Sequence, residues 1–243
     1  MDFRHKENNV ASASYEYYHQ GLRSYLVKVY KYMAFALGIT GITAYMTASS
    51  QGLMSLIYGT PLTWVIMFAP LVFVFFFTAK IHSMNFKTAQ MVLGLFAVVM
   101  GLSLSWIFIS YTGNSITRVF FISASMFGGM ALYGNTTHRD LTAFGSFLMM
   151  GVIGLVVASL LNIFMQSNAI LFATSVLGVI VFSGLTAYDA KTIKDQYYRL
   201  GGNNESNVDF LNKIAIMSSL RLYFDFINIF MSLLHLMGSS NRN

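Results

Sequence analysis

The sequence predicts an all-α membrane protein in which seven transmembrane helices form a bundle. Of its 243 residues, 56% are hydrophobic and only 10% are charged, which leaves few polar side chains to cover a soluble domain. Four segments contain no charged side chain, namely 32–79, 88–117, 119–137 and 141–188. Together they are long enough for about six helices of roughly 20 residues each. None of them alternates apolar and polar residues as the strands of a transmembrane barrel do, so helices are the prediction.

Each predicted span follows from these segments and from the polar residues between them. The links are short: "GNTTHRD" at 134–140 has the Gly, Asn and Thr that end one helix and start the next, so consecutive helices are expected to be antiparallel. A polar stretch at 191–213, whose "GGNNESN" centre predicts a flexible turn, precedes the last span. That span is the only one with charges near its middle. The seven predicted spans are Tyr32–Ser49, Leu62–Ala79, Thr88–Ser110, Thr117–Tyr133, Leu141–Phe164, Ala169–Asp189 and Ile214–Met237.

The chain divides into a polar N-terminal tail (1–31), the transmembrane domain (32–237) and a short C-terminal tail (238–243). The first 25 residues have no apolar core and no small-residue cleavage site, so no removable signal peptide is expected. The chain has no cysteine, which excludes disulfides and thiolate metal sites. Small residues at helical spacing predict seams where helices approach closely, or hinges of a gate. These are Gly38 with Gly41, Gly94 with Gly101, and Gly151 with Gly154.

The basic residues are distributed unevenly between the two sides of the predicted bundle. A formal net charge of +6 alone is compatible with nucleic-acid binding, but in a membrane protein the position of the charges matters more than their sum. With seven spans, twelve of the fifteen Lys and Arg residues fall in the N-terminal tail and the links on its side. The positive-inside rule therefore predicts a cytoplasmic N-terminus and an external C-terminus. If the last segment enters the membrane and returns, the C-terminus is cytoplasmic instead.

Two acids lie in or at the end of predicted spans, where a charge is costly. Asp189 closes the sixth span, and Asp225 lies about 18 Å into the seventh, at 1.5 Å per residue from Ile214. A charged side chain at the centre of a spanning helix costs roughly 2.5 to 3.5 kcal/mol, so such acids usually face the bundle interior and usually have a function. The two spans are consecutive and antiparallel, so both carboxyl groups can share one interior space. Such a pair retains a proton near neutral pH and, once deprotonated, offers two hard oxygen ligands to calcium.

Each acid also has a purely structural interpretation. Asp189 can reach water from the cytoplasmic end of its helix and then needs no function. Asp225 can pair with Arg221, which lies four residues earlier on the same helix face.

Several segments closely resemble the Bax inhibitor-1 (transmembrane Bax inhibitor motif) family, and its bacterial members most of all. The two most specific segments are "FSGLTAYDAKTIK", from Phe182, and "LRLYFDFINIFMSLL", from Leu220. The resemblance extends to "FAPLVFVFFF", "GLSLSWIFISYTG" and "LYGNTTHRDL" and covers nearly the whole chain. It implies seven helices with the last one central, in a multi-pass protein of the bacterial inner (plasma) membrane. It also implies a pH-sensitive calcium leak regulated by paired aspartates, here Asp189 and Asp225, which would also bind the transported calcium transiently.

The same resemblance points to charges around the acid pair. Family members can have a basic residue at the cytoplasmic end of the second span that holds the sixth-span acid, and the candidates for this latch are Lys80 and His82. A histidine latch would titrate near neutral pH, whereas a lysine latch would not. Arg221 stands where the family leads us to expect a small polar residue. Its fixed charge, one turn from Asp225, opposes a cation in the same space.

Other functions have less support in the sequence. Paired intramembrane aspartates also occur in aspartyl proteases, but the Gly-x-Gly-Asp segment of that class is absent, so no enzyme is predicted. The five histidines lack the spacing of a zinc hydrolase, and no glycine-rich phosphate loop is present, so no cofactor is expected. No nucleic-acid partner is expected either. The expected partners are the lipid bilayer and calcium as the transported ion. A protein that only binds membrane-embedded partners, such as proteases, stays open as the alternative.

Overall fold

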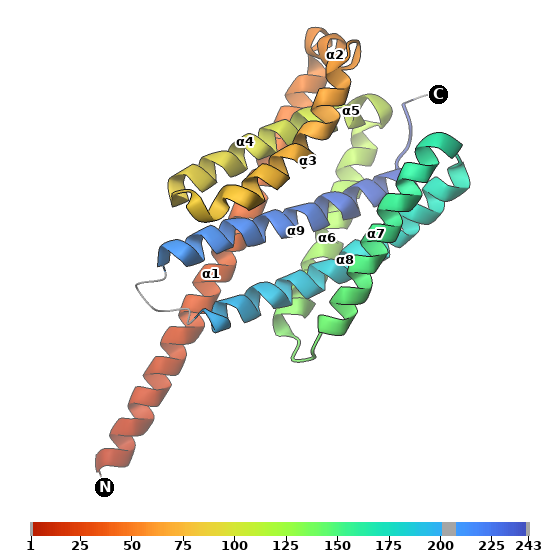
Figure 1. The fold of residues 1–243 in the computed structure, drawn as a ribbon. Helices are drawn as coiled ribbons and strands as arrows, with labels where there is room; N and C mark the ends of the chain where they lie inside the picture. Colours follow the sequence, from red (N-terminus) through yellow and green to blue (C-terminus); the bar gives the residue numbers. More distant parts are fainter. Residues whose placement is uncertain (1, 201–207, 242–243) are drawn as a thin grey trace.

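The computed structural model describes residues 2–200 and 208–241, and the side chains of 20–81, 83–200 and 209–241. All regular secondary structure in these residues is helical, which confirms the predicted class (Figure 1). The 3-10 helix η1 covers Ile81–Ser83. The α-helices are α1 (Asp2–Ser49), α2 (Gln51–Tyr58), α3 (Leu62–Lys80), α4 (Phe86–Leu104), α5 (Ile107–Ser110), α6 (Gly113–Thr136), α7 (Thr142–Met165), α8 (Asn168–Arg199) and α9 (Val208–Met237).

Six segments of the described chain are helical, long and apolar enough to cross a membrane. They coincide with the second to seventh predicted spans and are α3, α4 together with α5, α6, α7, α8 and α9. The first predicted span, Tyr32–Ser49, is the C-terminal part of α1, which is not among the six. The chain is therefore a multi-pass helical membrane protein, and the crossing of α1 stays a prediction.

Several helices extend further than their apolar segments. α8 continues ten residues past Asp189, α9 begins at Val208 instead of Ile214, and α1 includes most of the tail predicted to precede the first span. Apolar residues mark only the part of a helix that lies in lipid, whereas its backbone hydrogen bonds continue into water. The flexible turn predicted for 201–207 lies outside the described residues.

The predicted third span is interrupted near its end. α4 stops at Leu104, and α5 begins at Ile107 after a tight turn in which the Ser105 amide donates to the Leu102 carbonyl at 3.4 Å. The Tyr58 hydroxyl, from α2, lies 3.2 Å from Ser105 Oγ. The Ser105 side chain in this turn is thereby held by hydrogen bonds to Tyr58 and to the Leu102 carbonyl.

Helix α9 is the most buried of the six candidate spans. Of its most apolar stretch, 67% is buried within the protein, against 6% for α7. It packs against α1, α4, α6 and α8, and in Figure 1 it lies between α3 and α4 on one side and α6 to α8 on the other. Its fully buried Tyr223 shares a 2.9 Å hydrogen bond with Thr40 of α1, and Thr40 donates to the Ala97 carbonyl of α4 at 3.0 Å.

The two termini lie at opposite ends of the molecule (Figure 1). At the C-terminal end, the Thr112 amide donates to the Ser239 carbonyl at 3.1 Å, and the Asn241 amide donates to the Ser110 carbonyl at 3.0 Å. These bonds fix the C-terminal tail to the link between α5 and α6.

The glycines predicted as packing seams are mostly not at helix contacts. A Cβ added to Gly38, Gly41, Gly94 or Gly154 would meet nothing within 4 Å, so this prediction was wrong for those four. Of the six predicted glycines, only two approach another helix: Gly101 faces Thr43 and the Thr40 carbonyl, and Gly151 faces Val181. Approaches as close as that of Gly101 also occur at four glycines that the spacing did not single out, namely Gly134, Gly145, Gly178 and Gly184. Spacing along one helix does not tell which face meets a neighbour, and here many small residues face outward.

Candidate functional site

The contact between α8 and α9 determines which residues of the two helices lie opposite each other. A Cβ on Gly178 would meet the side chain of Ser232, so these two residues share one level. The helices are antiparallel neighbours (Figure 1), so each step forward on α8 corresponds to one step backward on α9. Asp189, eleven residues after Gly178, therefore lies at the level of Arg221. Asp225 lies one turn, about 6 Å, further from the N-terminal end of the bundle, at the level of Leu185.

The two acids and Arg221 form one electrostatic cluster. Asp189 and Asp225 interact with each other, and Arg221 interacts with both. Asp225 is 5% exposed, Asp189 is half-buried, and Arg221 is exposed. Within the described residues, the Oδ2 atom of Asp225 is buried without a hydrogen-bond partner. The two acids and Arg221 therefore lie within electrostatic range of one another, and the sharing of a proton between the acids stays a prediction.

The two latch candidates are positioned differently. Lys80 is exposed at the end of α3, where its side chain lines a small pocket with Phe77 and Met84. Helix α3 packs mainly on α4, and the charges that act on the acids are their own and that of Arg221. His82 lies in η1, and its side chain is outside the described residues. Lys80 as a latch would thus require α3 and α8 to come together, and that role stays a prediction.

No resident metal centre is formed around the acids in the described part of the chain. A stable site usually needs three or more ligating side chains, and no group of three His, Asp or Glu residues that could hold an ion is found there. Two carboxylates alone fit the transient contact of a passing cation better than a structural ion.

A polar network joins three helices at the same end of the bundle as Asp189. The Asn135 amide of α6 donates to the Tyr30 hydroxyl of α1 at 2.8 Å, and Lys194 Nζ of α8 donates to the Asn135 carbonyl at 2.8 Å. Ala187, two residues before Asp189, packs directly against Gly134. These contacts fix the segment that carries Asp189 against α6 and α1.

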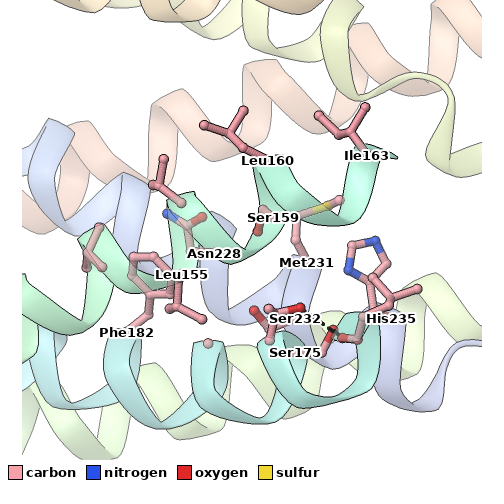
Figure 2. Close-up of a pocket in the computed structure, with 15 residues that line it drawn as sticks. Leu155, Ser159, Leu160, Ile163, Ser175, Phe182, Asn228, Met231, Ser232 and His235 are labelled. Carbon is pink, nitrogen blue, oxygen red and sulfur yellow. Dashed lines mark hydrogen bonds between the residues drawn. The ribbon is translucent and has the colours of Figure 1, made fainter. Parts of the chain in front are cut away.

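A pocket of about 360 Å³ lies on the other side of the acids, between α7, α8 and α9 (Figure 2). His235, Ser232 and Ser175 lie at one end of it, and Asn228, Phe182 and Leu155 lie at the other. Polar side chains from all three helices line it, although most of its wall is apolar. His235 is exposed, so the pocket is open at the end where α7 turns into α8.

Comparison with known proteins gives the family. The family described as inhibitor of apoptosis-promoting Bax1 matches residues 22–242. The chain belongs to the Bax inhibitor-1 family. It is 46% identical to the uncharacterized protein RP147 of Rickettsia prowazekii over 220 residues, which cover 90% of this chain and 91% of the relative. It is 40% identical to the inner membrane protein YbhL of Escherichia coli K12, over 90% of this chain and 93% of the relative.

Membership of the Bax inhibitor-1 family confirms the resemblance seen in the signature segments. The relatives include an inner membrane protein and, in Streptococcus pyogenes, a membrane protein that is 30% identical over 91% of this chain and 95% of its own. These names agree with the apolar helices of this Bax inhibitor-1 protein. They carry no activity over to it.

The sequence contained a signal for the pocket residues that was not used. Four polar residues follow one another on α9 at intervals of three, four and three positions, so they lie on one face of the helix. They are Asp225, Asn228, Ser232 and His235. On α8 the same spacing joins Ser175, Gly178 and Phe182. A search for polar residues at helical spacing inside apolar spans would have found this face of the Bax inhibitor-1 chain.

Proposed function

We propose that this protein is a pH-sensitive calcium leak of the bacterial inner membrane, gated by Asp189 and Asp225. In the closed state the two carboxyl groups share a proton. Loss of that proton leaves two anionic oxygens that repel each other and attract a hard divalent cation. The change in charge shifts α8 and α9 between a closed and a leaking form.

One observation carries this proposal: two acids lie one turn apart on the facing helices α8 and α9, and Oδ2 of the deeper one has no hydrogen-bond partner among the described residues. A buried carboxylate without a partner is expensive, and a shared proton removes most of that cost. Arg221 lies at the level of Asp189, one turn from Asp225, and does not hydrogen-bond to Oδ2 of Asp225, so it does not replace that proton.

The proposal includes a particular topology. The chain would cross the membrane seven times, with α1 as the first span, α9 at the centre and the N-terminus in the cytoplasm. It is supported by the burial of α9, by the opposite positions of the termini and by the basic residues at the N-terminal end. Both acids then lie in the cytoplasmic half of the bundle.

The test is calcium flux into liposomes that contain the reconstituted protein and a trapped calcium dye. Leak is measured from about pH 6 to about pH 8 for wild type, Asp189→Asn and Asp225→Asn, because mutual repulsion in a coupled acid pair delays the loss of the shared proton toward neutral pH. Either amide variant should lose the pH response, since it retains the shape of the side chain but cannot share a proton. The matched control is Asp195→Asn, which removes an acid of α8 that lines a different pocket with Asp140 and Arg199.

Equal leak and equal pH response in all four proteins would contradict the proposal. Absence of leak from the wild-type protein would instead favour the alternative, a membrane regulator that binds partner proteins. That protein would use the largely unburied face of α7.

A further inference from the structure

We infer that the pocket between α7, α8 and α9 is a water-filled vestibule closed at its inner end by Phe182. Its part in ion passage rests on the proposed function, whereas its hydration and its closure do not. The vestibule gives the acid pair a route to the end of the bundle opposite the N-terminus.

The first argument is the polarity of the pocket at membrane depth. Ser159 of α7, Ser175 of α8 and Asn228 of α9 all face it from inside candidate spans. Polar side chains inside a membrane usually line a water-filled cavity or pair with one another, because hydrocarbon offers no hydrogen bonds. The Ser175 hydroxyl and the Asn228 amide donate to carbonyls of their own helices, Leu171 at 2.7 Å and Phe224 at 2.8 Å. Their acceptor oxygens still face the pocket together with Ser159, and water is the occupant that can hydrogen-bond to side chains from all three helices.

The second argument is the line of polar residues on α9. His235, Ser232 and Asn228 follow one another along a single face, and the same face continues to Asp225. From His235 to Asp225 this line extends about 15 Å at 1.5 Å per residue. Hydroxyl and amide oxygens are suitable ligands for a partly hydrated calcium ion. The face thus leads from the open end of the pocket toward the buried carboxyl group.

The third argument is that the pocket ends abruptly at its inner end, where the next residues of α8 and α9 are buried. Phe182 and Asn228 lie at one level and are the deepest lining residues of their helices. One turn further, Leu185 and Asp225 are each only 5% exposed. Phe182 packs against both hydrophobic clusters of the protein, the large one around α9 and the smaller one of Leu148, Val181 and Leu185. A bulky apolar side chain at such a constriction excludes water and ions.

The absence of cysteine allows the hydration to be tested with single cysteines. In lipid nanodiscs, where both faces are open to reagents, a charged methanethiosulfonate should modify Ser232→Cys about tenfold faster or more than Ile153→Cys, because only a hydrated thiol ionises and reacts readily. Ile153 is the matched control. Contacts of Gly151 with Val181 and of Gly184 with Leu148 place it close to the depth of Ser232, but it is 65% exposed and does not line the pocket. If the two cysteines are modified at equal rates, whether slow or fast, the vestibule is overturned. Equal slow modification would mean that lipid fills the pocket.

The closure by Phe182 is tested by a thiol one turn beyond it. Leu185→Cys should react slowly, and adding Phe182→Ala should accelerate it about tenfold or more by opening the constriction. Phe172→Ala is the control, because this phenylalanine lies on the same helix but is 64% exposed and outside the pocket. A second control, Leu234→Cys, is fully buried and should stay protected when Phe182→Ala is present. Unchanged protection of Leu185→Cys in the Phe182→Ala protein overturns the closure.

These measurements separate the vestibule from the leak. In liposomes, Phe182→Ala should raise calcium leak about threefold or more, and Asp225→Asn in the same chain should abolish that increase. If no variant passes calcium but the thiol contrasts hold, the proposed function is wrong and the vestibule is correct. If calcium passes but the thiol contrasts fail, ions reach the acids by another route and the vestibule is wrong.

Discussion

At the scale of single residues, the two acids occupy unequal environments although they share one site. Asp225 is buried one turn deeper, whereas Asp189 is half-buried at the level of the exposed Arg221. Both carboxyl groups are desolvated, Asp225 more completely, so Asp189 is the member of the pair that water reaches more easily. A proton that enters or leaves the pair from the N-terminal end would pass Asp189 first. Both substitutions should abolish the pH response, and the amount of calcium leak in the liposome assay should change more for Asp225→Asn than for Asp189→Asn.

Arg221 gives a prediction about charge near the ion path. Replacing it, Arg221→Ser, should increase calcium leak, since the guanidinium interacts with both acids and repels a cation between them. A screened unit charge at this range changes the energy of the ion by about 1 kcal/mol, which corresponds to about fivefold in rate. The measurement is the liposome flux assay.

Lys213→Ser is the control for this charge. Lys213 lies on α9 eight residues before Arg221, about 12 Å along the helix, and is half-buried. Its removal should change the leak much less. An Arg221→Ser protein with unchanged or lower leak would show that the arginine does not oppose the ion.

At the scale of helices, close backbone contacts hold α8 in its place. A Cβ on Gly134 of α6 would collide with the Ala187 carbonyl of α8, and one on Gly145 of α7 would collide with the Tyr188 ring. Both contacts lie within four residues of Asp189. Such approaches are how helices associate in lipid, where no hydrophobic effect drives them together. The position of Asp189 is therefore set by its neighbours' glycines as well as by its own helix.

Gly134→Ala should destabilise the protein by about 1 to 3 kcal/mol, because the added methyl group overlaps a backbone oxygen that cannot move away alone. Gly129→Ala on the same helix is the control: its Cβ meets nothing within 4 Å, and alanine favours a helix. Thermal unfolding in detergent compares the two. Equal melting temperatures would mean that α6 and α8 can separate here without cost.

The helices could be predicted from the sequence more fully than the contacts between them. Charge-free segments located five of the six candidate spans, because a charge in lipid is costly wherever it lies on a helix, and the sixth, α9, was located by its apolar sequence despite Arg221 and Asp225. The ends were less predictable: α8 runs on to Arg199 in polar sequence. That α8 and α9 are neighbours was also predictable, since consecutive spans with a short link are antiparallel, whereas the pairing of Asp189 with Asp225 stays a prediction. Three features could not be predicted, because they depend on which faces of α7, α8 and α9 meet. They are the offset of one turn between Asp189 and Asp225, the exposure of Arg221 and the vestibule.

At the scale of the whole molecule, α9, the most buried of the candidate spans, connects the two ends. Lys28 Nζ of α1 donates to Asn212 Oδ1 at 2.6 Å where α9 begins, and the tail after α9 is bonded to the link between α5 and α6. Between them lie the acid cluster and the vestibule, on the face that α9 turns toward α8. A shift of α9 against α8 would therefore change both together. In the proposed mechanism, the change between the closed and the leaking form therefore takes place at this one interface.

The same architecture predicts on which side of the membrane each end lies. Ser239 follows α9, and Ser83 lies in the link between α3 and α4; both are exposed. With seven crossings and the basic end inside, an impermeant maleimide should label Ser239→Cys in intact spheroplasts and Ser83→Cys only after lysis. The cysteine-free parent chain is the background control. Protection of both positions would mean that the C-terminus returns to the cytoplasm and that the number of crossings is even. Labelling of Ser83→Cys alone would invert the topology, and both acids would then lie in the outer half of the bundle.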